Sequence, residues 1–214
     1  MINEEKKYKG PLGASDNRKK AFATYLLMVI ILGFFLLEIY YGGSQDTSSI
    51  YRLGAIFKFQ NQQVEWWRLF TSMFMHFGFA HLFLNLFSLF MVGPYVERSV
   101  GSFRFLVIYL LSGSGSMFFA TLLSPMPFLV LLGASGCIMG LLGAMAYVLF
   151  QAHIKEKSKI ARKSLNIIIF IFVFQVIFDI LTPNVSMVAH LSGFAFGFIL
   201  TFLLLAFKKV KPGS

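Results

Sequence analysis

Residues 133–150 read GASGCIMGLLGAMAYVLF and lie in an apolar stretch that runs from Phe128 to Phe150, with Ser135 as the only serine in the quoted segment. A second apolar stretch, from Val185 to Phe207, holds His190 near its start. Polar and ionisable groups at membrane depth are costly and mark function by default. A serine and a histidine placed in this way indicate a nucleophile and its general base.

The composition indicates a membrane protein with several spans. The chain has 214 residues, of which 57% are apolar and only 13% are charged. Six stretches are close to the roughly 20 residues that cross about 30 Å of hydrocarbon as a helix, although the fifth is short. These stretches are Ala21–Tyr41, Phe77–Glu97, Phe103–Leu123, Gly133–Gln151, Leu165–Leu181 and Val185–Phe207. We therefore expect an all-α membrane protein built as a bundle of six transmembrane helices.

The net charge of +10 fits membrane topology better than nucleic-acid binding. With a cytoplasmic N-terminus, 16 Lys and Arg residues fall on the inner side of the six spans and three on the outer side. This is the positive-inside pattern, and it places both termini in the cytoplasm. Attraction to anionic lipid headgroups is then a by-product.

This topology gives one membrane domain at residues 21–207, between cytoplasmic tails at 1–20 and 208–214. Residues 42–76 join the first two spans on the outer side and are too many for a mere connector. Trp67 beside Arg68 fits an element in the headgroup region, with the ring inward and the charge outward. We therefore expect an interfacial first outer loop.

Small residues predict that the fourth and sixth spans touch. Gly136 and Gly140 are four residues apart on the fourth span, and Gly193 and Gly197 are four apart on the sixth. Small residues at this spacing let helix backbones approach closely in lipid. Both spans run inward from the outer side, and the two glycines of the sixth share a face with the histidine. The serine and the histidine should therefore come within roughly 2.6–3.2 Å of each other.

The second span opens with His81 and Asn85, which are four residues apart and share one helix face. An acyl-transfer site needs hydrogen-bond donors where the tetrahedral intermediate develops its negative charge. The imidazole and the amide would supply such donors. The backbone N–H of Ser135, at a helix start, would add to them.

Five motifs occur in order within residues 65–200. They are Trp67-Arg68, His76-x4-His81-x3-Asn85, Glu97-x3-Gly101, Gly133-x-Ser135-Gly136 and His190-x2-Gly193-x3-Gly197. Each motif alone is weak, but together, within six spans, they resemble the rhomboid family of intramembrane serine proteases. The resemblance implies that Ser135 is the nucleophile and His190 its base, in a dyad that requires no carboxylate. It further implies an oxyanion hole formed by His81, Asn85 and the Ser135 N–H.

The resemblance also implies how substrate enters. The fifth span would open to admit it, and Leu84 and Phe172 would face each other across a lateral gap, which we interpret as a gate. Cleavage would follow small side chains, with helix-breaking residues nearby. Met139 stands where many family members have an aromatic residue packed on the histidine, so we expect His190 to be held less firmly.

Other polar residues have plainer interpretations. His76 lies off the face of His81, which favours a structural role. Asp179 could orient the histidine as a third member, but we favour an interfacial or loop-capping role. Glu38 should snorkel to the interface, and Glu97 should pair with Arg98 beside it.

We expect an intramembrane serine endopeptidase whose partners are transmembrane protein substrates and membrane lipids, with no nucleic acid. We place it in a bacterial plasma membrane, with the site opening toward the outer side, and expect neither cofactor nor metal. The outer histidines could instead hold zinc, but no His-Glu-x-x-His occurs. Two further alternatives are a catalytically inactive rhomboid-like factor for membrane-protein quality control and a small transporter using the buried histidines and asparagine. The oligomeric state stays open.

Overall fold

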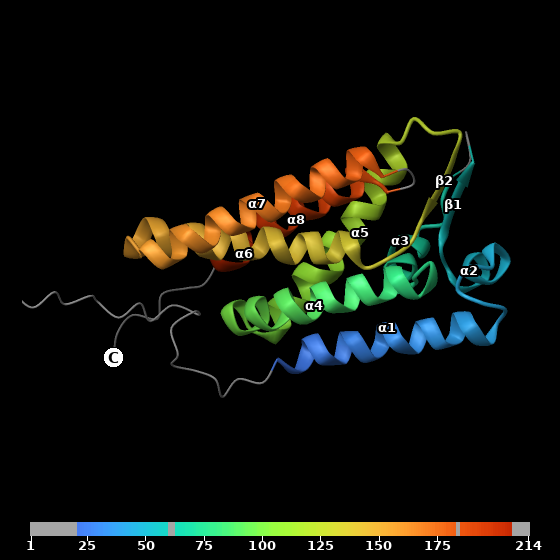
Figure 1. Ribbon diagram of the computed structural model, residues 1–214, viewed down its shortest axis with the longest axis horizontal. Helices are drawn as coiled ribbons and strands as arrows, with labels where there is room; N and C mark the ends of the chain where they lie inside the picture. The colour runs from blue at the N-terminus through green and yellow to red at the C-terminus, as the bar shows by residue number, and fades with distance from the viewer. Residues whose placement is uncertain (1–20, 60–62, 183–184, 207–214) are drawn as a thin grey trace, which may run out of the picture.

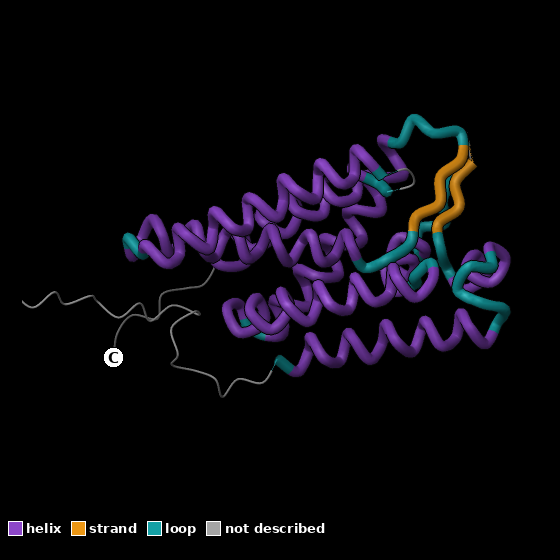
Figure 2. The backbone as a smooth tube through the Cα atoms, in the orientation of Figure 1, coloured by secondary structure: helices purple, strands orange, loops and turns teal. Residues whose placement is uncertain are grey.

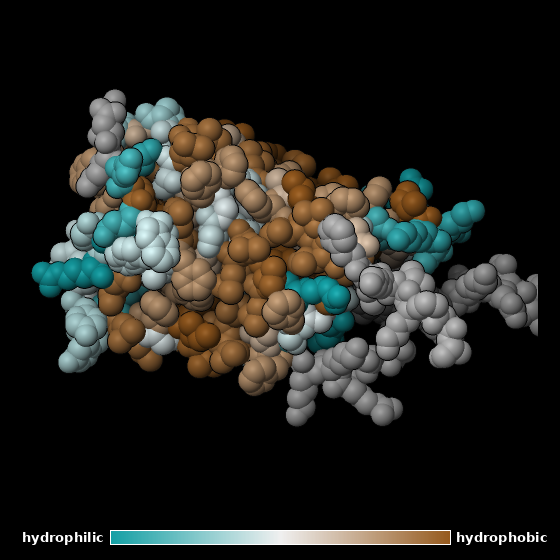
Figure 3. All heavy atoms as spheres, turned by 180° about the vertical axis from the view of Figure 1, so that it is seen from behind, coloured by the Kyte–Doolittle hydropathy of each residue, from teal (hydrophilic) through white to brown (hydrophobic). Residues whose placement is uncertain are grey.

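The computed structural model describes residues 21–59, 63–182 and 185–206, which form a bundle of long helices (Figure 1). Within these residues, six helices are long and apolar enough to cross a membrane. They are α1 (Phe22–Tyr40), α4 (Gly78–Val100), α5 (Ser102–Leu123), α6 (Ser135–Glu156), α7 (Lys159–Leu181) and α8 (Met187–Ala206). Figure 3 shows apolar side chains gathered over the middle of the bundle and hydrophilic ones at its two ends. The six expected spans are confirmed. The two expected tails lie outside the described residues.

The fourth and fifth spans are longer at their shared end than the sequence indicated. Helix α6 continues to Glu156, and α7 begins at Lys159, six residues before the expected start. The hydroxyl of Ser158 caps α7 by accepting the Ala161 N–H at 3.1 Å. Such a cap satisfies an orphan donor and lets a helix begin among basic residues. The apolar stretch ends at the first charged residues, so hydropathy underestimates the length of helices of this kind.

Helix α6 lies at the centre of the bundle, with 67% of its apolar window buried, and it packs against α4, α5, α7 and α8. A methyl group added to Gly193 would strike the carbonyl of Gly136, and one added to Gly197 would strike the carbonyl of Gly140. The predicted contact between the fourth and sixth spans is therefore confirmed. Because these backbones touch directly, the start of α8 is held against the start of α6.

The chain is not wholly helical. Strands β1 (Ile56–Phe59) and β2 (Phe128–Leu131) pair as an antiparallel two-stranded sheet beyond one end of the helices (Figure 2). Strand β2 occupies the first part of the apolar stretch that precedes Ser135 and is a local addition to the expected helical bundle. A short apolar run cannot be assigned to helix or strand by its pattern alone. Gly133, with a φ of +115°, separates the strand from the helix.

The first outer loop folds around Arg68. The loop contains α2 (Thr47–Leu53), β1, α3 (Arg68–Thr71) and the 3₁₀ turn η1 (Ser72–Phe74). The Arg68 guanidinium is buried, stacks on Tyr51 and Trp67, and donates to the carbonyls of Tyr51 and Ala55 at 2.6 and 2.9 Å. Its bond to Glu65, at 2.5 Å, lowers the pKa of that carboxyl. The expected outward charge is wrong, because free loop carbonyls draw the guanidinium inward.

Two carboxylates also differ from expectation. Glu38 does not snorkel: it is fully buried and accepts the His76 N–H at 3.0 Å. Glu97 does not pair with Arg98, which is exposed. It accepts the backbone N–H groups at the start of α1, from Ala23 at 2.9 Å and Thr24 at 2.8 Å. A helix start offers unsatisfied N–H groups, and these are a better match for a buried carboxylate than an exposed guanidinium.

Candidate active site

Ser135 is the first residue of α6 and follows a loop that is fixed on both sides. Strand β2 ends at Leu131, and the Gly133 N–H donates to the Ser72 carbonyl at 2.9 Å. Gly133 has a left-handed backbone, and a Cβ there would lie 2.6 Å from the His81 ring. Only glycine satisfies both conditions without strain. The loop therefore delivers the Ser135 hydroxyl to one fixed place beside α4.

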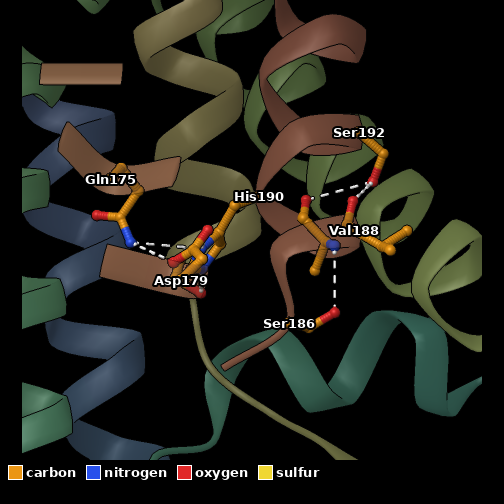
Figure 4. A network of polar contacts seen from close by, with 8 residues as sticks. Gln175, Asp179, Ser186, Val188, His190 and Ser192 are labelled. Atoms are coloured by element: carbon orange, nitrogen blue, oxygen red, sulfur yellow. Dashed lines mark hydrogen bonds and ion pairs between the residues drawn. The ribbon is translucent and has the colours of Figure 1, made fainter. Parts of the chain in front are cut away.

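The structure brings Ser135 and His190 together. The Ser135 Oγ lies 2.8 Å from His190 Nε2, within the range of a nucleophile–base pair. His190 is in the first turn of α8, where the Ser186 hydroxyl accepts the Ala189 N–H at 3.2 Å (Figure 4). With only 6% of its surface exposed, His190 has little freedom to turn away. Their catalytic roles stay a prediction at this point.

Asp179 contacts the other ring nitrogen of His190. Its Oδ2 lies 2.8 Å from His190 Nδ1, and its Oδ1 accepts the Gln175 amide at 2.7 Å (Figure 4). The expectation that Asp179 is interfacial or caps a loop is therefore wrong, and the ring has polar contacts at both nitrogens. Gln175 is not among the residues that the sequence predicts for the site. A polar pair at i and i+4 inside an apolar span was the available signal.

His81 and Asn85 lie on α4 beside the Ser135 loop. The His81 Nδ1 accepts the Phe77 N–H at 3.3 Å, so its Nε2 carries the proton, and that nitrogen lies on the Gly133 side. The Asn85 amide donates to the His81 carbonyl at 2.9 Å, which uses one of its two N–H groups. The first N–H groups of a helix have no intrahelical partner, and the N-cap residue of α6, Ala134, offers them no side-chain acceptor. Of these donors, the His81 ring is the one whose contact with the Ser135 loop is direct, through Gly133.

His76 supports this loop from behind. It is fully buried; its Nε2 accepts the Ala134 N–H at 3.4 Å and its Nδ1 faces the Phe74 carbonyl at 3.2 Å. Its ring lies 5.1 Å from that of His81, centroid to centroid. Burial, and secondarily the neighbouring His81, lowers the pKa of His76 to about 3, so the ring is neutral. These contacts fit the structural role that the sequence favoured.

The two residues interpreted as a gate have different surroundings. Leu84 is 60% exposed on α4, whereas the Phe172 ring on α7 packs on Phe194 of α8 with centroids 4.2 Å apart. Helix α7 has 11% of its apolar window buried, the lowest value among the six spans. Helix α7 as a whole is thus the most exposed of the six, and the gate itself stays a prediction.

Among residues 21–59, 63–182 and 185–206, no three His, Cys, Asp or Glu side chains converge in a way that would hold a metal ion. Cys137 is buried beside Met73, with the two sulfur atoms 3.6 Å apart. The polar groups around Ser135 instead form a chain of hydrogen bonds, from Gln175 through Asp179 and His190. Such a chain suits proton transfer to and from a hydroxyl.

The half-buried serine–histidine contact joins the first turns of two of the six helices that are long and apolar enough to cross a membrane. The Rhomboid domain family matches residues 63–207, more than half of the chain. The chain belongs to the rhomboid family.

The relatives differ in length and in what their names state. Over 198 residues the chain is 36% identical to rhomboid protease GluP of Bacillus subtilis, which covers 92% of this chain but 38% of that protein. Over 166 residues it is 36% identical to putative rhomboid protease YdcA of the same organism, covering 77% of each. It is also 36% identical over 151 residues to inactive RHOMBOID-like protein 8 of Arabidopsis thaliana, covering 70% of this chain and 41% of that one.

Proposed function

We propose that this protein is an intramembrane serine endopeptidase that cleaves peptide bonds in or near transmembrane segments of other membrane proteins. The observation that carries the proposal is the 2.8 Å contact between Ser135 Oγ and His190 Nε2 inside a bundle of apolar helices. A serine hydroxyl is a weak nucleophile unless an adjacent base takes its proton. His190 is placed to do so as Ser135 attacks the scissile carbonyl, and then to return the proton to the leaving amine.

The negative charge of the tetrahedral intermediate needs hydrogen-bond donors. The candidates are His81 Nε2–H, which lies beside Gly133, the second N–H of Asn85 one turn further along α4, and the N–H groups at the start of α6. Donors fixed before the reaction cost no reorganisation in the transition state. No cofactor or metal has a step in this scheme.

Substrate and water reach the site by different routes. Water comes from the outer side, where the starts of α6 and α8 lie under the positive-inside topology, and the substrate comes laterally from the lipid. A helical peptide bond hides its carbonyl, so the substrate must unwind locally. Separation of α7 from α4 at Phe172 and Leu84 would open the lateral route. The tails at 1–20 and 208–214 would be cytoplasmic, in a bacterial plasma membrane.

The test is cleavage of a reporter membrane protein with one transmembrane segment by the purified, reconstituted enzyme. We expect wild type to cleave it, and Ser135→Ala and His190→Ala to lose cleavage while keeping the wild-type melting temperature. A Ser135→Ala protein that still cleaves would refute the protease. Wild type that binds the reporter without cleaving it would instead support an inactive, binding relative.

A further inference from the structure

The buried face of α7 changes from apolar to polar residues at the level of the candidate site. Within the described helix, its buried residues are Ala161, Ile168 and Asp179. With Gln175, seven residues after Ile168, they form one stripe along the helix. Small or apolar residues would suffice for packing in lipid, where a carboxylate is expensive. The stripe therefore becomes polar at the level of His190, and packing alone does not account for it.

The Asp179 side chain is fully buried, with 0% of its surface exposed, and both of its oxygens have partners. Oδ2 lies 2.8 Å from His190 Nδ1, and Oδ1 accepts the Gln175 amide at 2.7 Å. Gln175 Nε2 is itself 3.4 Å from His190 Nδ1 (Figure 4). Gln175 thus fixes which oxygen faces the ring.

This contact selects one form of the imidazole. A carboxylate only accepts hydrogen bonds, so Nδ1 carries the ring proton and donates it to Asp179. Nε2 is then an acceptor for the Ser135 hydroxyl, the form that a general base requires. The carboxylate also offsets the positive charge that His190 gains when it takes the serine proton.

We infer that Asp179, held by Gln175, is a positioning residue that completes a Ser135–His190–Asp179 triad, and that α7 supplies it. The inference rests on the proposed protease function and goes beyond the dyad. It has a consequence for substrate entry, because α7 is the least buried span. When α7 moves away from the bundle, His190 loses its partner, and when α7 returns, the base is restored.

The test compares Asp179→Asn with wild type by two readouts. One is kcat and KM for the reporter membrane protein. The other is the rate at which a fluorophosphonate, a small diffusible probe, labels Ser135. An amide in place of the carboxylate favours the wrong tautomer, which costs up to about 10⁴ in kcat in soluble serine proteases. We expect a fall of more than about tenfold in both kcat and labelling rate, with KM within about threefold of wild type.

A charge swap and a control separate position from packing. Gln175→Glu with Asp179→Asn moves the carboxylate one helical turn along the same face, and we expect it to restore about tenfold or more of the lost rate. Asp46→Asn makes the same chemical change at the cap of α2, where the carboxylate bonds Ser48 and Ser49, and should behave as wild type. If Asp179→Asn does not fold, the double variant Gln175→Glu, Asp179→Asn is the test. Activity of this variant within about tenfold of wild type supports the triad, and a folded double variant with lower activity refutes it.

Three results would overturn the inference. They are an Asp179→Asn protein with wild-type kcat and labelling rate, one that is slow on the membrane substrate but labels normally, and a folded swap that recovers nothing. The second would mean that Asp179 acts on entry. In each case, cleavage of the reporter by Ser135→Ala is measured alongside and tests the proposed protease function. If Ser135→Ala cleaves the reporter, the proposed function fails; if it does not, only the triad fails.

Discussion

Ser135 depends on backbone conformation as much as on its own side chain. Gly133 turns the chain in a left-handed conformation beside the His81 ring, and His76 holds the Ala134 N–H. The hydroxyl is therefore aimed before any substrate arrives. Pre-organisation of this kind supplies much of the rate enhancement in serine hydrolases, because the groups need no rearrangement during the reaction.

Replacement of the proposed oxyanion donors should slow chemistry more than binding. His81→Ala and Asn85→Ala should each lower kcat by about 10²–10³, or roughly 2.7–4 kcal/mol of transition-state stabilisation, with little change in KM. Steady-state kinetics on the reporter protein measure both constants. If both variants turn over at the wild-type rate, the donors lie elsewhere and the serine–histidine pair is unaffected.

His76 should make stability depend on pH. Its pKa is lowered from 6.5 to about 3 in the folded protein, so between these values the unfolded chain binds a proton that the folded one does not. The contribution of neutral His76 to the free energy of unfolding is therefore fully present above pH 6.5. It decreases as the pH falls, and about 2 kcal/mol is lost at pH 5. Melting temperatures in detergent from pH 7.5 to 5 measure it. His76→Gln should flatten this dependence, and an equally steep curve would contradict the assignment.

The backbones of α6 and α8 are in direct contact at their glycines, so there is no room for larger side chains at these positions. A Cβ on Gly197 would meet backbone atoms of Gly140, which cannot yield as a flexible side chain can. Gly197→Ala should therefore lower the free energy of unfolding by about 1–3 kcal/mol. Thermal unfolding in detergent measures it. The matched control is Gly33→Ala in α1, where nothing lies within 4 Å, and it should be neutral or stabilise by about 0.5–1 kcal/mol. Equal effects at the two sites would contradict the contact.

Helix α7 is the element expected to move. Shrinking Leu84 and Phe172 together to alanine should raise the rate of cleavage of membrane-embedded substrates, because opening limits turnover in many gated enzymes. Phe170→Ala, at a side chain that is 70% exposed on the same helix, is the control and should leave the rate unchanged. A disulfide engineered between α4 and α7 should block cleavage until it is reduced. Full-speed cleavage by the cross-linked enzyme would place entry elsewhere.

For the molecule as a whole, the parts that follow from local chemistry were predictable. Long apolar runs gave the six spans, and glycines four residues apart gave the contact between α6 and α8. Together with topology they predicted that Ser135 and His190 would meet, as the 2.8 Å distance shows. Each of these signals lies within one stretch of chain or follows from a simple packing rule.

Most of the features that the sequence did not predict join distant segments. Pairing of β1 with β2 needs two short strands whose partners are about 70 residues apart, and neither has a pattern of its own. The sequence predicts Glu38 and Arg68 at the interface, because charges usually lie there, and Glu97 paired with Arg98. Each instead satisfies backbone groups that only the folded chain brings close. Asp179 belongs to the same class, since its partner is on another helix.

In the proposed mechanism, His190 activates Ser135 within the bundle of apolar helices. The most direct measurement is mass-spectrometric mapping of the purified protein after reaction with a fluorophosphonate. We predict a single adduct, on Ser135, that is absent from both Ser135→Ala and His190→Ala. A wild-type protein that takes up no label, or that carries it on another residue, would contradict the account.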